Sequence, residues 1–83
     1  MKFELTKHAK KALVEREIPV AWVERTLASL ELCLPDPDDA TVERRYRKII
    51  EYGGRVLRVA VNTAVEPNRV VSVFFDRRMK GKL

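Results

Sequence analysis

The spacing of apolar residues changes once along this chain of 83 residues, and that change limits the fold more than any other feature. Up to residue 30, apolar side chains recur three or four positions apart, as on one side of a helix; beyond residue 41 they tend to alternate, as in strands. Helices that precede a run of strands favour an α+β fold, with the helices on one face of an antiparallel sheet. The length is that of one domain, residues 1–83.

Two short helices are predicted before residue 31. Residues 7–17 contain strong helix formers without glycine or proline, and the Thr6 hydroxyl can cap the first turn. The pair Ile18-Pro19 ends this helix, because a residue before proline disfavours the helical conformation. Pro19 suits the first turn of a second helix over residues 19–30. One apolar stripe of that helix consists of Val20, Val23, Leu27 and Leu30.

The rest of the chain is predicted to form strands and turns. Residues 3–5 are a brief strand, and residues 31–41, with two prolines and three aspartates, are an acidic loop. Gly53-Gly54 marks a β-hairpin turn. Longer strands are expected at residues 42–52, 55–64 and 69–76. We therefore predict two helices packed on a three- to four-stranded antiparallel sheet, in the order β-α-α-β-β-β, and a basic tail over residues 77–83 that frays.

Charge is distributed unevenly along the chain. The net charge is +5, yet residues 1–40 carry −2 and residues 41–83 carry +7, from eleven basic and four acidic residues. A strongly basic half suggests an anionic partner, either nucleic acid or an acidic protein. The alternative is a solvated basic surface that serves solubility alone.

Several kinds of site lack the residues that they require. One histidine and one cysteine cannot form a structural zinc site, and Cys33 alone cannot form an internal disulfide, as is usual in the cytoplasm. No apolar run approaches the roughly 20 residues that span a bilayer, and the first residues lack the apolar segment of a signal peptide. We expect a cytoplasmic protein with no metal, no cofactor and no membrane association.

One segment places cations next to an aromatic residue. In a strand over Arg44-Arg45-Tyr46-Arg47-Lys48, the first, third and fifth side chains share one face, and Arg45 and Arg47 share the other. Cations neutralise phosphates and bases stack on aromatic rings, so this pattern suits RNA. The alternative is an edge strand whose charges discourage aggregation.

Further cations follow in the later strands. Arg58 lies opposite the apolar face of its strand, and Arg77, Arg78 and Lys80 follow the last strand. In a meander these cations come from neighbouring strands, so they could converge on one sheet surface and hold a scissile phosphate. The acids that could pair with them instead are Glu43, Glu51 and Asp76.

Two residues of the first predicted helix also stand out. Arg16 falls near the centre of the apolar stripe, where a guanidinium needs a partner or a path to water. We favour a structural role for Arg16, with an ion pair or a bond to a helix C-terminal carbonyl. His8, at the edge of the stripe, is a candidate for proton transfer, or else a surface or capping residue.

The sequence also resembles a known family. The resemblance rests on His8-Ala9, Leu13, Arg16 and Ile18, on the Arg/Tyr-rich strand, and on residues 57–61 and 70–74 before the basic tail. These are similar to a small uncharacterised prokaryotic domain family that is grouped with RelE-like and BrnT-like toxins of toxin–antitoxin pairs. Glu17 stands where many relatives have glycine. The resemblance implies two helices on an antiparallel sheet, as the apolar spacing does.

For function, the resemblance implies a metal-independent endoribonuclease that binds free or ribosome-associated RNA. Arg58 with Arg77 or Arg78 would hold the phosphate, and Tyr46 or His8 would stack on a base or move a proton from the ribose 2′-hydroxyl. The RNA-binding cations would be Arg44, Arg45, Arg47, Lys48, Arg78 and Lys80. The alternative is a non-catalytic binding module, or a homodimer, that recognises an acidic antitoxin or nucleic acid; a domain whose charge has no specific role is also open.

Overall fold

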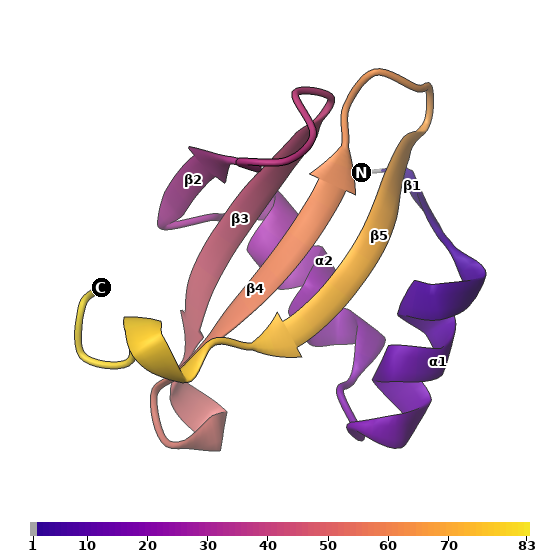
Figure 1. The fold of residues 1–83 in the computed structure, drawn as a ribbon. Helices are drawn as coiled ribbons and strands as arrows, with labels where there is room; N and C mark the ends of the chain where they lie inside the picture. Colours follow the sequence, from indigo (N-terminus) through magenta and orange to yellow (C-terminus); the bar gives the residue numbers. More distant parts are fainter. Residues whose placement is uncertain (1) are drawn as a thin grey trace.

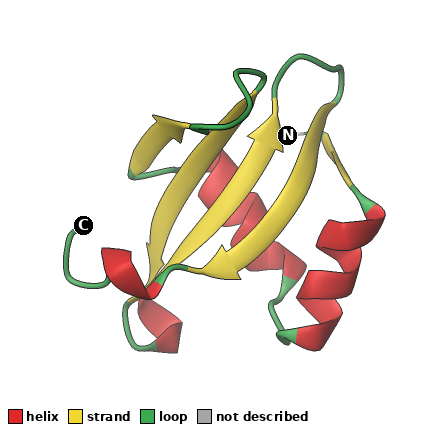
Figure 2. Ribbon diagram, in the orientation of Figure 1, coloured by secondary structure: helices red, strands yellow, loops and turns green. Residues whose placement is uncertain are grey.

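The computed structural model describes residues 2–83 as two α-helices, a five-stranded sheet and two short 3-10 helices (Figures 1 and 2). The helices are α1 (Lys7–Glu15) and α2 (Val20–Ala28), with the 3-10 turns η1 (Ile50–Tyr52) and η2 (Arg77–Met79). The strands are β1 (Phe3–Leu5), β2 (Leu32–Pro35), β3 (Val42–Ile49), β4 (Arg55–Asn62) and β5 (Asn68–Phe75). The predicted α+β class is confirmed.

The sheet is mixed and has the strand order β1-β5-β4-β3-β2. Consecutive strands from β2 to β5 pair antiparallel, whereas β1 runs parallel to β5, with Phe3 opposite Asn68. The predicted sheet of three to four antiparallel strands is therefore corrected to five strands with one parallel pair. The order of elements along the chain includes one further strand, β2, between the helices and β3.

Strand β2 lies inside the segment that was expected to be an acidic loop. Its four residues pair with β3, from Leu32 opposite Tyr46 to Pro35 opposite Glu43. Proline is tolerated at the edge of a sheet, because one side of an edge strand needs no donor. The prolines and aspartates that suggested a loop begin at Pro35, the last residue of the strand.

Helix α1 ends two residues before the predicted end. Thr6 caps its start, since the hydroxyl accepts a hydrogen bond from the Ala9 N–H at 3.1 Å. At its end the Glu17 N–H donates to Val14 and the Ile18 N–H donates to Leu13, which is the Schellman arrangement. Glu17 takes the left-handed conformation, φ 53°, that this arrangement requires.

The core lies between the sheet and the two helices, which cover the same face (Figure 2). Helix α1 packs on β5, and α2 packs on β3 and β4. The central buried cluster consists of Ala9, Leu13, Ile18, Val23, Leu27, Ile49, Leu57, Val59, Val61, Val70 and Val73. None of the helices within residues 2–83 is long and apolar enough to cross a membrane. The other face of the sheet, here called the open face, carries no α-helix (Figure 1).

One short turn precedes β4, and another follows β5. Gly53 and Gly54 adopt φ of 67° and 72°, as the predicted hairpin turn requires, but the preceding residues form η1 instead of extending β3 to residue 52. The tail, expected to fray, begins with η2, which Asp76 caps by accepting a hydrogen bond from the Arg78 N–H at 3.0 Å. Further along, Lys48 Nζ donates to the Leu83 carbonyl at 3.5 Å.

Candidate functional site

The basic run of β3 divides between the two faces of the sheet. Arg45 and Arg47 stand opposite Val59 and Leu57, which belong to the core beneath the helices. Arg44, Tyr46 and Lys48 therefore lie on the open face, and the predicted alternation is confirmed. The cations of this run consequently cannot form one surface.

The two arginines on the helix side have partners within the domain. Arg45 Nη2 lies 3.2 Å from the Glu43 carboxylate. Arg47 Nη1 donates to the Ser29 carbonyl at 2.6 Å, and Ser29 is the C-cap of α2. A cation at the end of a helix satisfies free carbonyls and complements the helix dipole. These contacts give Arg45 and Arg47 structural roles.

On the open face, three side chains form a row across the middle strands. Tyr46 of β3, Arg58 of β4 and Phe74 of β5 occupy paired positions. Tyr46 is only 3% exposed. The Arg58 guanidinium lies 4.0 Å from the Phe74 ring centroid and 3.6 Å from the Asp76 carboxylate. Tyr46 and Arg58 are adjacent, but both side chains are largely buried within the domain.

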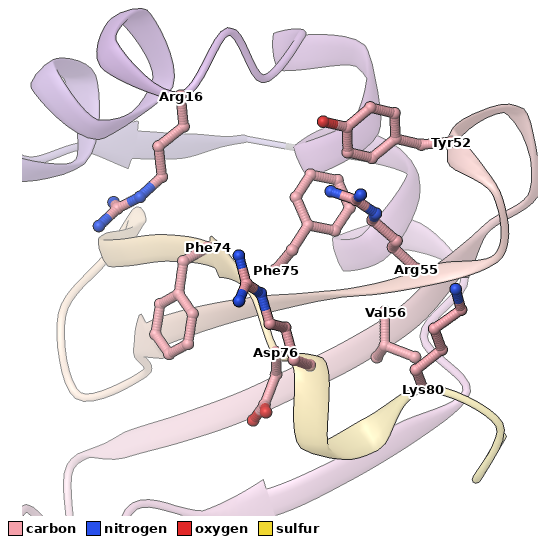
Figure 3. A pocket seen from close by; sticks show the side chains of 9 residues that line it. Arg16, Tyr52, Arg55, Val56, Phe74, Phe75, Asp76 and Lys80 are labelled. Carbon is pink, nitrogen blue, oxygen red and sulfur yellow. The ribbon is translucent and has the colours of Figure 1, made fainter.

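The main cavity lies where β5 ends and β4 begins, beyond the end of α1 (Figure 3). Its volume is about 610 Å³. We call it the basic cavity, and its lining consists of Arg16, Tyr52, Arg55, Val56, Phe74, Phe75, Asp76, Arg77 and Lys80. Four cations from three separate parts of the chain thus face one space.

The arginines of the basic cavity have no carboxylate partner among the described residues. Among residues 2–83, six of the ten arginines lie within 4.0 Å of a carboxylate. The four without such a carboxylate are Arg16, Arg47, Arg55 and Arg77. Arg47 caps α2, and the other three all line the basic cavity. Lys80 also lines it and forms no ion pair among the described residues.

Arg16 reaches the cavity because α1 ends before it. As the C-cap it no longer follows the helical repeat, so the apolar stripe that seemed to include it stops earlier. Its side chain is exposed, and Nη1 donates to the Val73 carbonyl of β5 at 3.3 Å. The predicted contact with a backbone carbonyl is present, but the carbonyl belongs to a strand.

An aromatic cluster forms one wall of the basic cavity. The Tyr52 ring packs 4.9 Å from Phe75 and 5.6 Å from Trp22, measured between centroids. The Arg55 guanidinium lies over the Tyr52 ring at 4.6 Å. Tyr52 therefore orients Arg55 by a cation–π contact, and the cluster behind Tyr52 holds the ring in place.

Two carboxylates near the cavity are already engaged. Asp76, 6% exposed, lies within 3.6 Å of both Arg58 and Arg78. Glu51 accepts a hydrogen bond from Arg25 at 2.8 Å, and this bond lowers the pKa of Glu51 to about 2. Neither acid is therefore free to neutralise the cavity arginines.

The structure brings together some of the residues singled out in the sequence. Arg16, Arg77 and Lys80 line the basic cavity, and Arg78 follows Arg77 but is paired with Asp76. His8 lies exposed in the first turn of α1, at the opposite end of that helix from Arg16. Arg44 pairs with Asp36 at 3.3 Å. Within residues 2–83 no group of three or more histidine, cysteine or acidic residues could hold a metal ion.

The sequence reasoning missed Tyr52 and Arg55. Both flank the Gly53-Gly54 turn, and the one signal for Arg55 was its position directly after that turn, at the start of β4.

Comparison with known proteins places the chain in a family. Residues 5–75 match the model of a domain of unknown function, DUF4258. The chain belongs to the DUF4258 family. Searches of curated proteins and of solved structures gave no match. The part that matches DUF4258 includes Arg16, Tyr52 and Arg55, and it ends at Phe75, immediately before the cap of η2.

Proposed function

We propose that this DUF4258 domain is a toxin-related RNA-binding domain of the RelE-like type and that it holds RNA phosphate in the basic cavity. The observation that carries the proposal is the convergence of Arg16, Arg55 and Arg77 on one cavity without a carboxylate partner. A cluster of unneutralised guanidinium groups is stable when an anion completes it. Because the sequence resembles RelE-like and BrnT-like toxins, we propose RNA as this anion.

The chemistry of the cavity suits phosphate better than a base. Guanidinium groups present donors in a fixed fork that matches phosphate oxygens. The exposed aromatic ring, Tyr52, already carries Arg55 on its face. The cavity volume of about 610 Å³ falls in the range of small-ligand sites. Binding should therefore depend on the RNA backbone and vary little with base sequence.

Endoribonuclease cleavage is the catalytic form of this proposal. When a ribose 2′-hydroxyl attacks its neighbouring phosphate, negative charge grows on the phosphate oxygens, and fixed cations stabilise that charge. In this form Arg16, Arg55 and Arg77 take the role first expected of Arg58 and Arg77, because Arg58 is engaged by Asp76. Cleavage would continue in the presence of a chelator.

Binding tests the proposal directly. A fluorescent single-stranded RNA is titrated with wild type and with Arg16→Gln, Arg55→Gln and Arg77→Gln, and anisotropy is measured. Each variant removes one charge-assisted hydrogen-bonding group, so binding should weaken about tenfold. The matched control is Arg69→Gln, which removes an exposed arginine paired with Glu4 outside the cavity. Equal affinities for the control and the cavity variants would contradict the proposal.

Salt dependence and cleavage separate the remaining readings. For single strands, every phosphate that the protein neutralises adds about 0.7 to the steepness with which log affinity falls against log salt, so each cavity variant should have a shallower slope than wild type. RNA-end mapping after incubation with a chelator reports cleavage. Binding confined to an acidic antitoxin-like protein, without RNA affinity, would favour the non-catalytic binding module instead.

A further inference from the structure

We infer that the basic cavity takes a phosphomonoester, the phosphate at the end of an RNA strand or of a free nucleotide, in preference to an internal phosphodiester. This inference rests on the RNA-binding part of the proposed function, because it names the phosphate that the same cavity would hold, and it does not use the endoribonuclease form, in which that phosphate is internal. It adds a chemical class of ligand that the general affinity for an RNA backbone does not specify.

The first argument is the balance of charge. Four cations line the cavity, and the one acid in its lining, Asp76, lies beside Arg58 and Arg78. An internal phosphodiester carries one negative charge and would leave most of the cations unneutralised. A terminal phosphate carries about −1.5 to −2 near neutral pH. The phosphate group at a strand end therefore neutralises up to about twice as much of the cavity's positive charge as an internal phosphate group does.

The second argument is the direction from which the donors come. Arg16 follows α1, Arg55 begins β4, and Arg77 and Lys80 belong to η2 and its C-cap. In Figure 3, Arg16 and Arg55 lie on opposite sides of the cavity. A monoester offers three free oxygens to donors that approach from different sides. A diester presents only two free oxygens, since the other two carry the chain in both directions.

The third argument is that the cavity offers little to a base. Arg55 covers the Tyr52 ring at 4.6 Å, and Arg58 covers the Phe74 ring at 4.0 Å. Two of the three aromatic rings in the lining thus position arginines, and the third, Phe75, packs against Trp22 and Tyr52. A site that reads phosphate and leaves the base unread suits a strand end of any sequence.

The test uses one RNA sequence in three forms: with a 5′-phosphate, with a 3′-phosphate, and with hydroxyl groups at both ends. Affinities for the full chain are measured by calorimetry, with a nucleoside monophosphate as a fourth probe. One phosphorylated form should bind about tenfold more tightly than the hydroxyl form. If the nucleoside monophosphate binds tightly by itself, the phosphate comes from a free nucleotide. If the nucleoside monophosphate binds weakly, the phosphate is the one at the RNA end.

Variants show whether the preference arises in the cavity. Arg77 is exposed in η2, so Arg77→Gln should not affect folding. In this variant the preference for the phosphorylated end should disappear, whereas Arg69→Gln should keep that preference. If the hydroxyl form binds wild type as tightly as the phosphorylated forms and binds Arg77→Gln more weakly, the inference fails and the proposed function stands. If none of the RNAs binds, both fail. A preference that persists in Arg77→Gln and Arg16→Gln also overturns the inference.

Discussion

Asp76 forms ion pairs with two arginines, Arg58 and Arg78. Its buried carboxylate accepts a hydrogen bond from the Arg78 N–H and lies within 3.6 Å of Arg58 and Arg78. Burial of a carboxylate is tolerated only when charge and hydrogen bonds compensate it, and these contacts supply that compensation for Asp76. Two of the arginines that the sequence suggested for phosphate binding are therefore occupied by one acid.

Asp76→Asn should destabilise the domain by about 3 kcal/mol, because it leaves the mostly buried Arg58 without its counter-charge while keeping a side-chain acceptor for η2. Urea unfolding followed by circular dichroism measures the change. Glu66→Gln, at an exposed turn position, is the control and should stay within about 0.5 kcal/mol of wild type. A destabilisation as small as that of the control would mean that Arg58 does not depend on Asp76.

The candidate site was predicted from residue type only in part. Arg77 and Lys80 were identified by their charge, and Arg16 by its odd place on a helical wheel. The roles of Arg58 and Arg78 depend on which cations a buried acid reaches, and the roles of Tyr52 and Arg55 depend on a turn that folds against the end of β5. The Arg58–Asp76 and Tyr52–Phe75 contacts join residues far apart along the chain, so no local pattern records them.

At the scale of the elements, the end of α1 holds Glu17 in an unfavourable backbone conformation and also brings Arg16 to the basic cavity. The Schellman arrangement needs the left-handed conformation at Glu17, and a side chain there is strained because its Cβ approaches the backbone. The same arrangement releases Arg16 from the helix and aims it at the cavity. A glycine at this position would fit the same turn without strain.

Glu17→Gly should therefore stabilise the domain by about 1 kcal/mol. The expected readout is a rise in the melting temperature with the proposed RNA affinity unchanged, since the Arg16 side chain keeps its place. Glu15→Gly, inside the last turn of α1, is the matched control and should lower stability by about 1 kcal/mol, the usual effect of glycine within a helix. Destabilisation by Glu17→Gly would show that the Glu17 side chain has a contact that outweighs the strain.

The helices and the long strands were predictable because each has a repeat of its own. The predicted boundaries agree with those of the structure to within a few residues. They are marked by Thr6, by the Ile18-Pro19 pair and by the Gly53-Gly54 turn. Strand β2 was not predictable, because its four residues are too few for an alternation and run into Pro35. The parallel pairing of β1 was hidden for a different reason: its partner, β5, begins 63 residues after Leu5 at Asn68.

For the whole molecule, the pair Arg25–Glu51 predicts part of the response to acid. It lowers the pKa of Glu51 from an ordinary value of 4.5 to about 2 in the folded domain. The unfolded chain takes up this proton first as the pH falls, so stability from the pair is complete above about pH 4.5 and is lost between there and pH 2. Both side chains are solvent-exposed, which keeps the effect small.

Glu51→Gln should therefore lose less stability than wild type between pH 4.5 and 2, as measured by urea unfolding at several pH values. Glu24→Gln, on the exposed side of α2, should follow the wild-type profile. Parallel profiles for Glu51→Gln and wild type would show that the pair does not form in solution.

The parallel contact between β1 and β5 has a consequence for how the chain is made. Synthesis delivers β1 and α1 first, but the strand on which both pack is the last of the five to be completed. Until then the apolar side of α1, with Ala9 and Leu13, has no surface to cover it. The core therefore cannot be completed until β5 is released, although α2 can pack on β3 and β4 before that.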